Sequence, residues 1–534
     1  MIRVSELALA ACRRLGEFNR PPLRFGSIPR DHGRMRARSG ASQLGLRLRA
    51  RSGVAWARRW PASLLLIIGT LSTAKAIGTA APVEPHRLEV DFSIATGLLR
   101  PLHGINKGPL AANGLVDLTE AQRRLRVPWT RLHDCHNPNP AVVDLHAVFP
   151  NPTADPDTPA SYDFRATDLY LAAIRTTGAQ IIYRLGESIE HQPIKRHVHP
   201  PPDPARWAAA CAGIVRHYNH GWASGFHWDI RYWEIWNEPE NRPVMWTGTE
   251  AQFLELYRLT ARRLRQEFPA IRIGGPGFGY YGQFDGTTLK PSTFCAAFLD
   301  ECQRQSLPLD FFSWHCYTDK PSELAARARA VRQLLDTRGF KHTESHLNEW
   351  NYLPDNSWDV LSPRADPELR QRAAERMAGI EGGTFAVAAL LELQDAPVTV
   401  CNFYHGETGL FGLFTEVGAP QRNYYALLAF VQLLETPRRV RLSGTMPDRL
   451  VAAAGLSADH QRAGILVANR TGPDTVAVAW SHLPWTGPSA IEVRVVDNAR
   501  AWALLPEPKT AQNQLTLRLS PPAIAWISLR PQQP

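Results

Sequence analysis

The stretch 231–240, RYWEIWNEPE, organises the interpretation of the whole chain. It begins as an apolar, aromatic-rich run and ends abruptly in Asn237, Glu238 and Pro239. β-Branched and aromatic residues favour a buried strand, and proline ends a strand because it has no N–H to donate. The pattern therefore predicts that Glu238 lies at the C-terminal tip of a buried strand. We expect burial to raise the pKa of its carboxyl group, which suits an acid that works near neutral pH.

A second stretch, 346–352 (HLNEWNY), places Glu349 in the same kind of setting. Asparagine and tryptophan side chains flank this glutamate, and Trp350 offers a ring on which a sugar can stack. A single glutamate at a strand end is as often a structural residue in an ion pair. Two such carboxyl groups, surrounded by amides and indoles, are the groups that hydrolysis of a glycosidic bond requires.

Strand-like and helix-like segments alternate along the chain. The strand-like runs are 102–106, 129–134, 179–185, 232–236, 271–275, 311–317, 346–350 and 398–404. The helix-like segments are 118–125, 168–176, 204–218, 251–268, 292–305, 323–339, 366–389 and 423–434. Eight alternations predict an α/β fold, a (β/α)₈ TIM barrel, in which the active site is built at the C-terminal ends of the strands. Glu238 then ends the fourth strand and Glu349 the seventh.

The last hundred residues change character. Short alternating strands separated by turn residues replace the helices, which is typical of a β-sandwich. We expect a short β-element near residues 88–94 to pair with them. The predicted organisation is a basic leader with a secretory signal (1–76), a linker with the N-terminal β-element (77–100), the catalytic barrel (101–436) and the accessory β-sandwich (437–534).

The charge of the chain is concentrated at its start. Of the 60 Lys and Arg and the 50 Asp and Glu, residues 1–76 hold 15 and 3, so the remainder carries 45 basic against 47 acidic groups. The net charge of +10 therefore belongs to the leader, and the body has no overall positive field that would bind nucleic acid.

The leader resembles a targeting segment. An apolar run at 62–73 follows Arg58 and Arg59, and 74–76 (AKA) has the small-x-small form of a cleavage site. These features predict a secretory signal, hence export to the periplasm or the medium and no stable membrane anchor after cleavage. The run is short for a membrane span, although an uncleaved anchor is the alternative. Met35 is a candidate for the true start.

Five motifs, taken in order, resemble glycoside hydrolase family 39, the β-xylosidase and α-L-iduronidase family, over roughly residues 88–530. They are 103–109 (HGINKGP), 131–134 (RLHD), 233–239 (WEIWNEP), 310–317 (DFFSWHCY) and 348–351 (NEWN). The Asn-Glu-Pro triplet alone is moderately specific, whereas the ordered set is strong.

The resemblance implies a retaining enzyme in which Glu238 is the acid/base and Glu349 the nucleophile. It implies further that Asn237 binds the sugar 2-hydroxyl and that His315 or Tyr317 hydrogen-bonds the nucleophile. His103 and His133 would line the pocket for the glycone, the sugar that is released.

Two features depart from the family pattern. Asn348 stands before Glu349, where a small residue or threonine is more usual. No Lys/Arg pair is assignable to a uronate carboxylate, although Arg131 and Arg184 could each serve. The second departure favours a neutral glycone such as xylose.

Two other motifs carry less weight. His133 to His136 (HDCH) and 197–199 (HVH) contain metal-ligand types, but strand alternation cannot aim four successive side chains at one ion, so no metal is expected. The glycine-rich segment 275–279 lacks both the third glycine and the βαβ context of a dinucleotide site, so no cofactor is expected.

The sequence thus predicts an exported retaining β-glycosidase, β-xylosidase-like, whose partner is an oligosaccharide or glycoside substrate. An endo-acting exopolysaccharide glycosidase on the same fold is the alternative within the enzyme class. A non-catalytic carbohydrate-binding protein on a degenerate barrel is the alternative outside it, and retention of both glutamates argues against it. The oligomeric state is not predicted.

Overall fold

The computed structural model describes residues 86–135, 141–362, 364–444, 449–472, 474–506, 508 and 510–532. The predicted leader and signal (1–76), with Met35, lie outside these residues, as do 77–85 of the linker and His136 of the HDCH motif. Among the helices of the described part, none combines the length and the apolar character needed to cross a bilayer.

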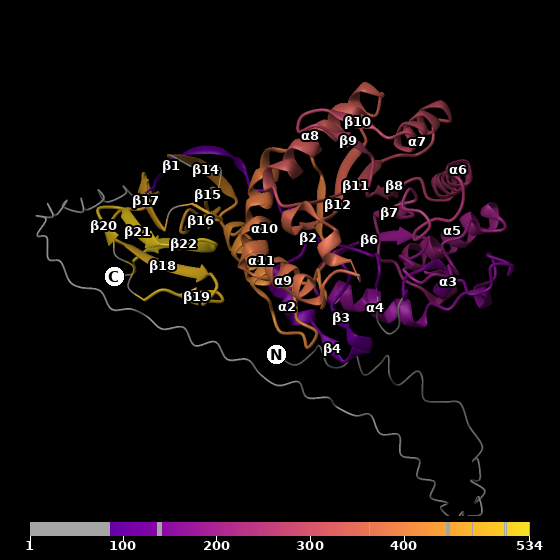
Figure 1. Cartoon of the computed structure of the whole chain (residues 1–534), viewed down its shortest axis with the longest axis horizontal. Helices are drawn as coiled ribbons and strands as arrows, with labels where there is room; N and C mark the ends of the chain where they lie inside the picture. The colour runs from indigo at the N-terminus through magenta and orange to yellow at the C-terminus, as the bar shows by residue number, and fades with distance from the viewer. Residues whose placement is uncertain are drawn as a thin grey trace, which may run out of the picture. The chain divides into compact units, whose positions relative to one another are not determined.

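Eight parallel strands form a closed barrel in chain order, and helices surround it (Figure 1). The strands are β2 (Gly104–Asn106), β5 (Trp129–Arg131), β6 (Gln180–Leu185), β7 (Tyr232–Ile235), β8 (Arg272–Phe278), β11 (Phe311–Thr318), β12 (Glu344–Tyr352) and β13 (Val400–Phe403). Nearly every residue in them is buried, because helices cover the outside of a parallel barrel and side chains fill its inside. The predicted (β/α)₈ fold class is confirmed.

The helices of the barrel are α2 (Thr119–Leu125), α3 (Leu145–Val148), α4 (Arg165–Thr176), α5 (Pro204–His220), α6 (Glu250–Glu267), α7 (Thr293–Arg304), α8 (Pro321–Thr337), α9 (Pro367–Ala378), α10 (Ile380–Glu392) and α11 (Arg422–Leu433). The single helix predicted over 366–389 is wrong. Gly379 adopts an extended conformation, ends α9 and caps the start of α10. A glycine in the middle of a helix costs backbone entropy, and here it divides the segment.

Short elements occupy the connections of the barrel. They are β3 (Leu110–Ala111), β4 (Val116–Asp117), β9 (Gly282–Phe284), β10 (Leu289–Pro291) and the 3₁₀ helices η1 (Ala112–Gly114), η2 (Pro159–Ser161), η3 (Trp222–Ser224), η4 (Pro354–Asn356), η5 (Asp359–Leu361) and η6 (Leu393–Asp395). The hairpin β9–β10 follows the C-terminal end of β8, so it stands on the face of the barrel where sites are built.

The C-terminal region forms one hydrogen-bonded sheet with the order β19-β18-β22-β16-β15-β14-β1-β17-β21-β20. Its strands are β1 (His86–Leu98), β14 (Arg438–Gly444), β15 (Leu450–Leu456), β16 (Ala463–Asn469), β17 (Thr475–Ser481), β18 (Ser489–Val496), β19 (Ala503–Leu504), β20 (Thr510–Ala511), β21 (Gln514–Arg518) and β22 (Ala523–Pro531). Val478 and Leu515, near one end of this order, share a core with Ile465 and Ile527 near the other. The sheet therefore folds over itself in the manner of a sandwich.

The N-terminal strand β1 lies inside this C-terminal sheet. It pairs antiparallel with β14 and parallel with β17, and its Leu88, Val90 and Phe92 contribute to the core. The outer surface of the sheet packs against the barrel, because Leu466 and Trp526 belong to the same apolar cluster as the residues of α10 and α11. Figure 1 shows these two helices between the barrel and the sheet.

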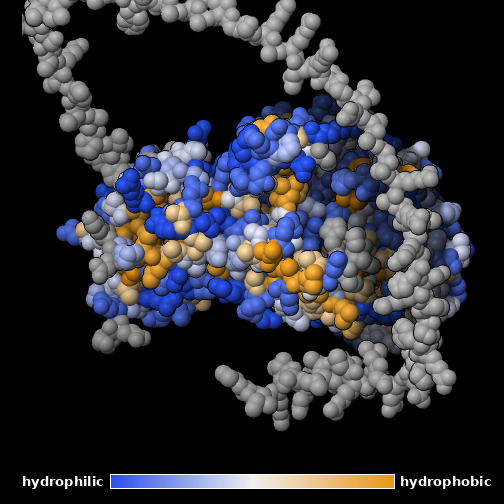
Figure 2. Space-filling model, turned by 60° about the horizontal axis from the view of Figure 1, so that its bottom comes forward, coloured by the Kyte–Doolittle hydropathy of each residue, from blue (hydrophilic) through white to orange (hydrophobic). Residues whose placement is uncertain are grey.

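Most of the surface visible in Figure 2 is hydrophilic, with several apolar areas between the charged side chains. Large apolar residues that are exposed in the described part include Leu98, Leu115 and Val417. Single exposed apolar residues are ordinary for soluble domains, so they assign no function by themselves.

Candidate active site

Glu238 is presented by a strained turn at the C-terminal end of β7. Trp236 (φ 72°) and Glu238 (φ 44°) both have left-handed backbones, which is uncommon for residues other than glycine and is concentrated at functional sites. The N–H of Glu238 donates to the carbonyl groups of Pro276 and Gly277, each at 3.1 Å. The neighbouring strand β8 therefore holds the turn in place.

Glu349 is presented by an irregularity in β12. Leu347 pairs with Trp314 of β11, yet the next pair joins Glu349 to His315, so Asn348 is an extra residue. Such a bulge redirects the side chains that follow it. The unexpected Asn348 also has a function here, because its side chain donates a hydrogen bond to the buried Glu234.

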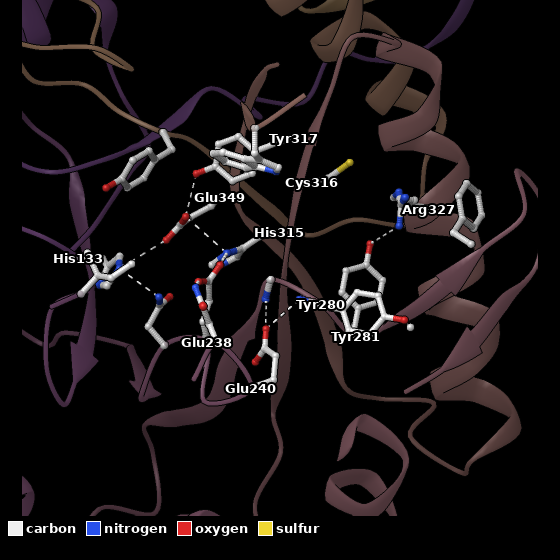
Figure 3. A pocket seen from close by; sticks show the side chains of 18 of the residues that line it. His133, Glu238, Glu240, Tyr280, Tyr281, His315, Cys316, Tyr317, Arg327 and Glu349 are labelled. Atoms are coloured by element: carbon white, nitrogen blue, oxygen red, sulfur yellow. Dashed lines mark hydrogen bonds and ion pairs between the residues drawn. The ribbon is translucent and has the colours of Figure 1, made fainter. Parts of the chain in front are cut away.

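The two carboxyl groups meet at His315. One atom of each of Glu238, His315 and Glu349 lies within 4.8 Å of the others. The His315 Nδ1 is 2.8 Å from Glu238 Oε1 and 3.4 Å from Glu349 Oε2 (Figure 3). The carboxyl groups thus face each other across a short gap, as hydrolysis of a glycosidic bond requires.

Arg131, at the end of β5, carries the charge that balances this site. Its Nη1 is 2.7 Å from Glu349 Oε1, its Nε is 2.6 Å from Glu234 Oε2, and its Nη2 donates to Asn237 Oδ1 at 2.6 Å. The guanidinium group is fully buried. On the other side, the Tyr317 hydroxyl donates to Glu349 Oε2 at 2.9 Å. Both oxygens of Glu349 therefore accept hydrogen bonds that favour its ionised form.

We expect Arg131→Met to lower the free energy of unfolding by about 3–5 kcal/mol, because it leaves the buried Glu234 and Glu349 without their cation. Urea unfolding at pH 7 measures this loss. At pH 4 the loss should be smaller, since burial raises the pKa of Glu349 and its carboxyl group can then become neutral. A loss below about 1 kcal/mol at pH 7 would contradict the role of Arg131 as their counter-charge.

A polar pocket lies beside Glu349 on the side of β5 and β7. The side-chain amide of Asn237 donates to His133 Nε2 at 3.0 Å, and this nitrogen is 3.4 Å from Asp134 Oδ1. Tyr404, which follows β13, donates its hydroxyl to Asp134 Oδ2 at 2.9 Å. Burial lowers the pKa of His133 well below its ordinary value, so its ring is neutral at pH 7 and serves as a hydrogen-bonding group.

The pKa values of Glu238, His315 and Glu349 depend on one another because the three groups are in contact. Burial raises the pKa of Glu238, but the hydrogen bond and charge of His315 outweigh this and leave its pKa below the ordinary value. The raised pKa predicted for Glu238 from its strand-end position is therefore wrong in this arrangement. For Glu349 burial prevails and its pKa is raised, while burial lowers the pKa of His315 less than the two carboxylates raise it. The pKa directions thus favour the protonated form of His315 and the ionised form of Glu238.

A cavity of about 1340 Å³ opens over these groups. Of the predicted site residues, it is lined by His133, Asn237, Glu238, His315, Tyr317 and Glu349. Its lining also includes Asp134, Glu240, Tyr280, Trp358, Tyr404 and Phe411, which the sequence did not single out as site residues. Arg131, Asp134 and Tyr404 lie at predicted strand ends and could have been chosen on that ground. Glu240 and Tyr280 carry no comparable signal.

Two predicted site residues do not reach this cavity. His103 is buried, with its Nε2 3.1 Å from the carbonyl oxygens of Leu125 and Arg126 at the end of α2. Trp350 is fully buried, with its ring edge-on to Phe403. Successive residues of a strand point to opposite faces, so Trp350 turns toward the helices where Glu349 turns inward. Both are structural residues, and their predicted contact with substrate is wrong.

The metal-ligand motifs of the sequence have other roles. His197 stacks on His146 with ring centroids 3.6 Å apart, and His199 Nδ1 is 2.7 Å from Thr247 Oγ1. The cluster Asp144, His146 and Glu187 is close enough to surround an ion. The Asp144 oxygens, however, already accept hydrogen bonds from Arg184 and Ser188, and the adjacent guanidinium disfavours a second cation.

A second cavity of about 330 Å³ opens between two proline-rich loops, which follow β5 and β6. Residues 145–152 of the first loop and 196–203 of the second contribute to its lining. The second loop also begins with Ile189 and His191, which line the main cavity. The loop after β6 therefore shapes one wall of the active-site cleft.

Glu407, which follows β13, is a buried carboxyl group whose Oε2 has no hydrogen-bond partner in the described part of the chain. Burial raises its pKa to about 7, although Lys107 partly counteracts this. A raised pKa in the folded state means that the fold favours the neutral form of Glu407. The contribution of this group to the free energy of unfolding is therefore fully present below pH 4.5 and is lost as the pH rises toward 7.

We therefore expect Glu407→Gln to change the free energy of unfolding more favourably at pH 8 than at pH 4.5, by about 3 kcal/mol. The amide cannot ionise, so the substitution removes the cost of a buried charge. Urea unfolding of both proteins at the two pH values measures the change. An effect that is equal at both values would show that Glu407 ionises as freely in the folded as in the unfolded chain.

A sequence model of glycosyl hydrolases family 39 matches residues 143–369, a range that contains Glu238 and Glu349. A β-xylosidase from Geobacillus stearothermophilus is 26% identical over 264 residues, which are 44% of this chain and 48% of that protein. A β-xylosidase from Caldicellulosiruptor saccharolyticus is 24% identical over 305 residues, 51% of this chain and 54% of that protein. The chain thus spans about half the length of these two relatives.

Solved structures agree with the fold. A glucosidase from Croceicoccus marinus superposes with a TM-score of 0.70 at 25% identity and covers 84% of this chain and 100% of that one. A β-xylosidase from Caulobacter crescentus CB15 has a TM-score of 0.63 with the same coverage, and at 15% identity it supports the fold alone.

Proposed function

Because the chain belongs to glycoside hydrolase family 39, we propose that it is a retaining β-glycosidase of the β-xylosidase type, acting on xylo-oligosaccharides or related glycosides. Family membership and the two β-xylosidase relatives support the reaction class. The choice of xylose as the released sugar rests on those relatives and on the charge of the pocket.

The observation that carries the proposal is the separation of the two carboxyl groups. An oxygen of Glu238 lies within 4.8 Å of an oxygen of Glu349. Retaining enzymes hold their two carboxyl groups about 5–5.5 Å apart, whereas inverting enzymes need about 6.5–9.5 Å to admit a water molecule. The short gap supports direct attack by one carboxylate on the sugar.

In the first step, Glu349 attacks the anomeric carbon while Glu238 donates its proton to the leaving oxygen, so the glycosidic C–O bond breaks as the new ester bond forms. In the second step, Glu238 takes a proton from water, and the resulting hydroxide displaces Glu349 from the anomeric carbon. Arg131 and Tyr317 hydrogen-bond Glu349 and stabilise the carboxylate that enters and leaves. Asn237, oriented by Arg131 and His133, is placed to bind the 2-hydroxyl.

His315 supplies the proton that the first step requires. Its Nδ1 is 2.8 Å from Glu238 Oε1, and its pKa is raised by the two carboxylates. When a neutral sugar fills the gap, water leaves and an ionised Glu238 loses its remaining solvation. Transfer of the proton from His315 to Glu238 then yields a neutral acid beside a charged nucleophile, the pair of states that the reaction needs.

The pocket charges favour a neutral sugar. Arg131 is committed to Glu234 and Glu349, and the fully buried Arg184 pairs with Asp144 and does not line the cavity, so neither is placed to bind a uronate carboxylate. Arg327, a basic residue of the cavity lining, lies on the far side from His133 (Figure 3).

A panel of aryl β-xylosides, β-glucosides and α-L-arabinosides tests this function, with NMR of the first sugar released. We expect the β-xyloside to be hydrolysed best and β-xylose to appear before it mutarotates. An inverted first product would reject the retaining mechanism. Preference for the glucoside would reject only the choice of xylose.

We also propose that the protein is exported, on the pattern of the basic segment, the apolar run 62–73 and the small-x-small sequence at 74–76. N-terminal sequencing of the protein recovered from cells that express the gene should then begin after Ala76. Recovery of the intact leader would contradict cleavage.

A further inference from the structure

Part of the main cavity takes no part in the bond-breaking steps. Beyond Glu238, away from His133 and Asn237, it is lined by residues 279–285 and by Thr288 and Lys290 of the hairpin β9–β10. Ligand pockets usually measure about 300–1,000 Å³, so a cavity of about 1340 Å³ has room beyond the released sugar. In Figure 3, Glu240 and Tyr280 lie on this side of Glu238.

Tyr280 is the exposed aromatic residue of this region. Its side chain is 55% exposed, and its ring contacts no other aromatic ring in the described part of the chain. Contact between the face of a large aromatic ring and water is unfavourable, so burial of that face against an apolar surface is favourable. The face of a pyranose ring, with its C–H groups, is such a surface.

Glu240 fixes the backbone that carries this ring. Its Oε1 accepts the N–H of Gly279 at 2.7 Å and that of Tyr280 at 2.8 Å. Burial and the neighbouring Glu238 raise the pKa of Glu240 to about 8, so it holds these N–H groups mainly as a neutral carboxyl at pH 7. The backbone that carries the Tyr280 ring is thus held at a defined place, so only the rotation of the side chain remains to be lost on binding.

The same segment touches the proton donor. A Cβ atom on Gly279 would lie 2.3 Å from Glu238 Oε1, so the backbone before Tyr280 runs directly against that carboxyl group. A sugar whose glycosidic oxygen receives the proton of Glu238 must therefore extend past Gly279 toward Tyr280.

We propose that Tyr280, positioned by Glu240, forms a leaving-group subsite that binds the ring of the sugar on the far side of the cleaved bond. This inference rests on the proposed glycosidase function and adds its substrate class. The enzyme would select substrates whose leaving group is itself a sugar, over glycosides of small alcohols.

The test compares xylobiose with β-xylosyl fluoride, which has the same glycone and no leaving-group sugar. We expect Tyr280→Ala to lower kcat/KM for xylobiose about tenfold more than for the fluoride. Tyr280→Phe keeps the ring and should restore the ratio to within about twofold of the wild-type value. Leu169→Ala removes another exposed apolar side chain, on α4 and outside the cavity lining, and should leave the ratio unchanged.

Glu240 is tested as a positioning residue through the same ratio. Glu240→Gln retains an oxygen for the two N–H groups and should behave as the wild type, whereas Glu240→Met should lose most of the preference for xylobiose. If Glu240 acts through Tyr280, the double variant Glu240→Met/Tyr280→Ala should lose no more than Tyr280→Ala alone. Additive losses would reject this coupling.

The outcomes separate the two proposals. If the wild type hydrolyses both substrates and Tyr280→Ala leaves their ratio unchanged, the subsite is wrong and the glycosidase function stands. If the wild type hydrolyses neither these substrates nor any of the aryl glycosides, the proposed function fails and the subsite fails with it.

Discussion

Replacing Glu349 by glycine is expected to lower kcat about 10⁵-fold or more, because the carboxylate that we propose to attack the anomeric carbon is lost. The substitution also leaves a small space beside Arg131 and Tyr317, which hydrogen-bond this carboxylate. Azide can occupy that space and attack from the same face. With an aryl β-xyloside that has a good leaving group, azide should restore activity and yield the α-glycosyl azide by a single inversion.

Formation of the α-anomer of the glycosyl azide would identify Glu349 as the nucleophile. Thermal unfolding of the variant should establish that the protein remains folded, because removal of Glu349 leaves part of the Arg131 charge uncompensated. A folded variant that keeps more than about one per cent of wild-type activity without azide would exclude Glu349 as the nucleophile.

Replacing Glu238 by alanine is expected to have an effect that depends on the leaving group. Loss of the proposed acid should lower kcat by about 10²–10⁴-fold for xylobiose or a phenyl xyloside, whose leaving oxygens need a proton. A 2,4-dinitrophenyl xyloside needs none, so its first step should be nearly unaffected and the glycosyl-enzyme should accumulate as a burst of dinitrophenol. Azide should then give the β-glycosyl azide, since it attacks the covalent intermediate from the opposite face.

Equal losses on both classes of substrate would mean that Glu238 does not act as the acid. Asn241→Ala provides a milder comparison. It removes a hydrogen bond that Asn241 donates to Glu238 Oε2 at 2.9 Å, but it leaves the Glu238 carboxyl group in place. A small loss with the same dependence on the leaving group is expected there.

Local patterns were enough to place the barrel and the two glutamates. Buried strands such as 232–236 are nearly continuous apolar runs, and the polar residues that follow them mark the end where a barrel builds its site. Long helices with clear starts were equally visible: α6 begins at a capping box in which Thr249 and Gln252 hydrogen-bond each other's backbone N–H groups.

Other features depend on contacts between distant segments. The pKa of Glu238 is set by His315, 77 positions away along the chain, and not by the strand end alone. The Glu240–Tyr280 pair joins the loops after β7 and β8 through backbone N–H groups, which no residue pattern encodes. The error over Trp350 was of another kind, since simple strand alternation from Glu349 already directs that side chain away from the cavity.

The position of β1 has a consequence for synthesis on the ribosome. Of the strands in the described part of the chain, β1 is synthesised first, yet its partners β14 and β17 begin about 340 and 380 residues later, at Arg438 and Thr475. Through most of translation its apolar Leu88, Val90 and Phe92 have no sheet to join and must be shielded from premature pairing. A nascent chain that stalls before β14 will therefore carry this apolar strand without either of its partners.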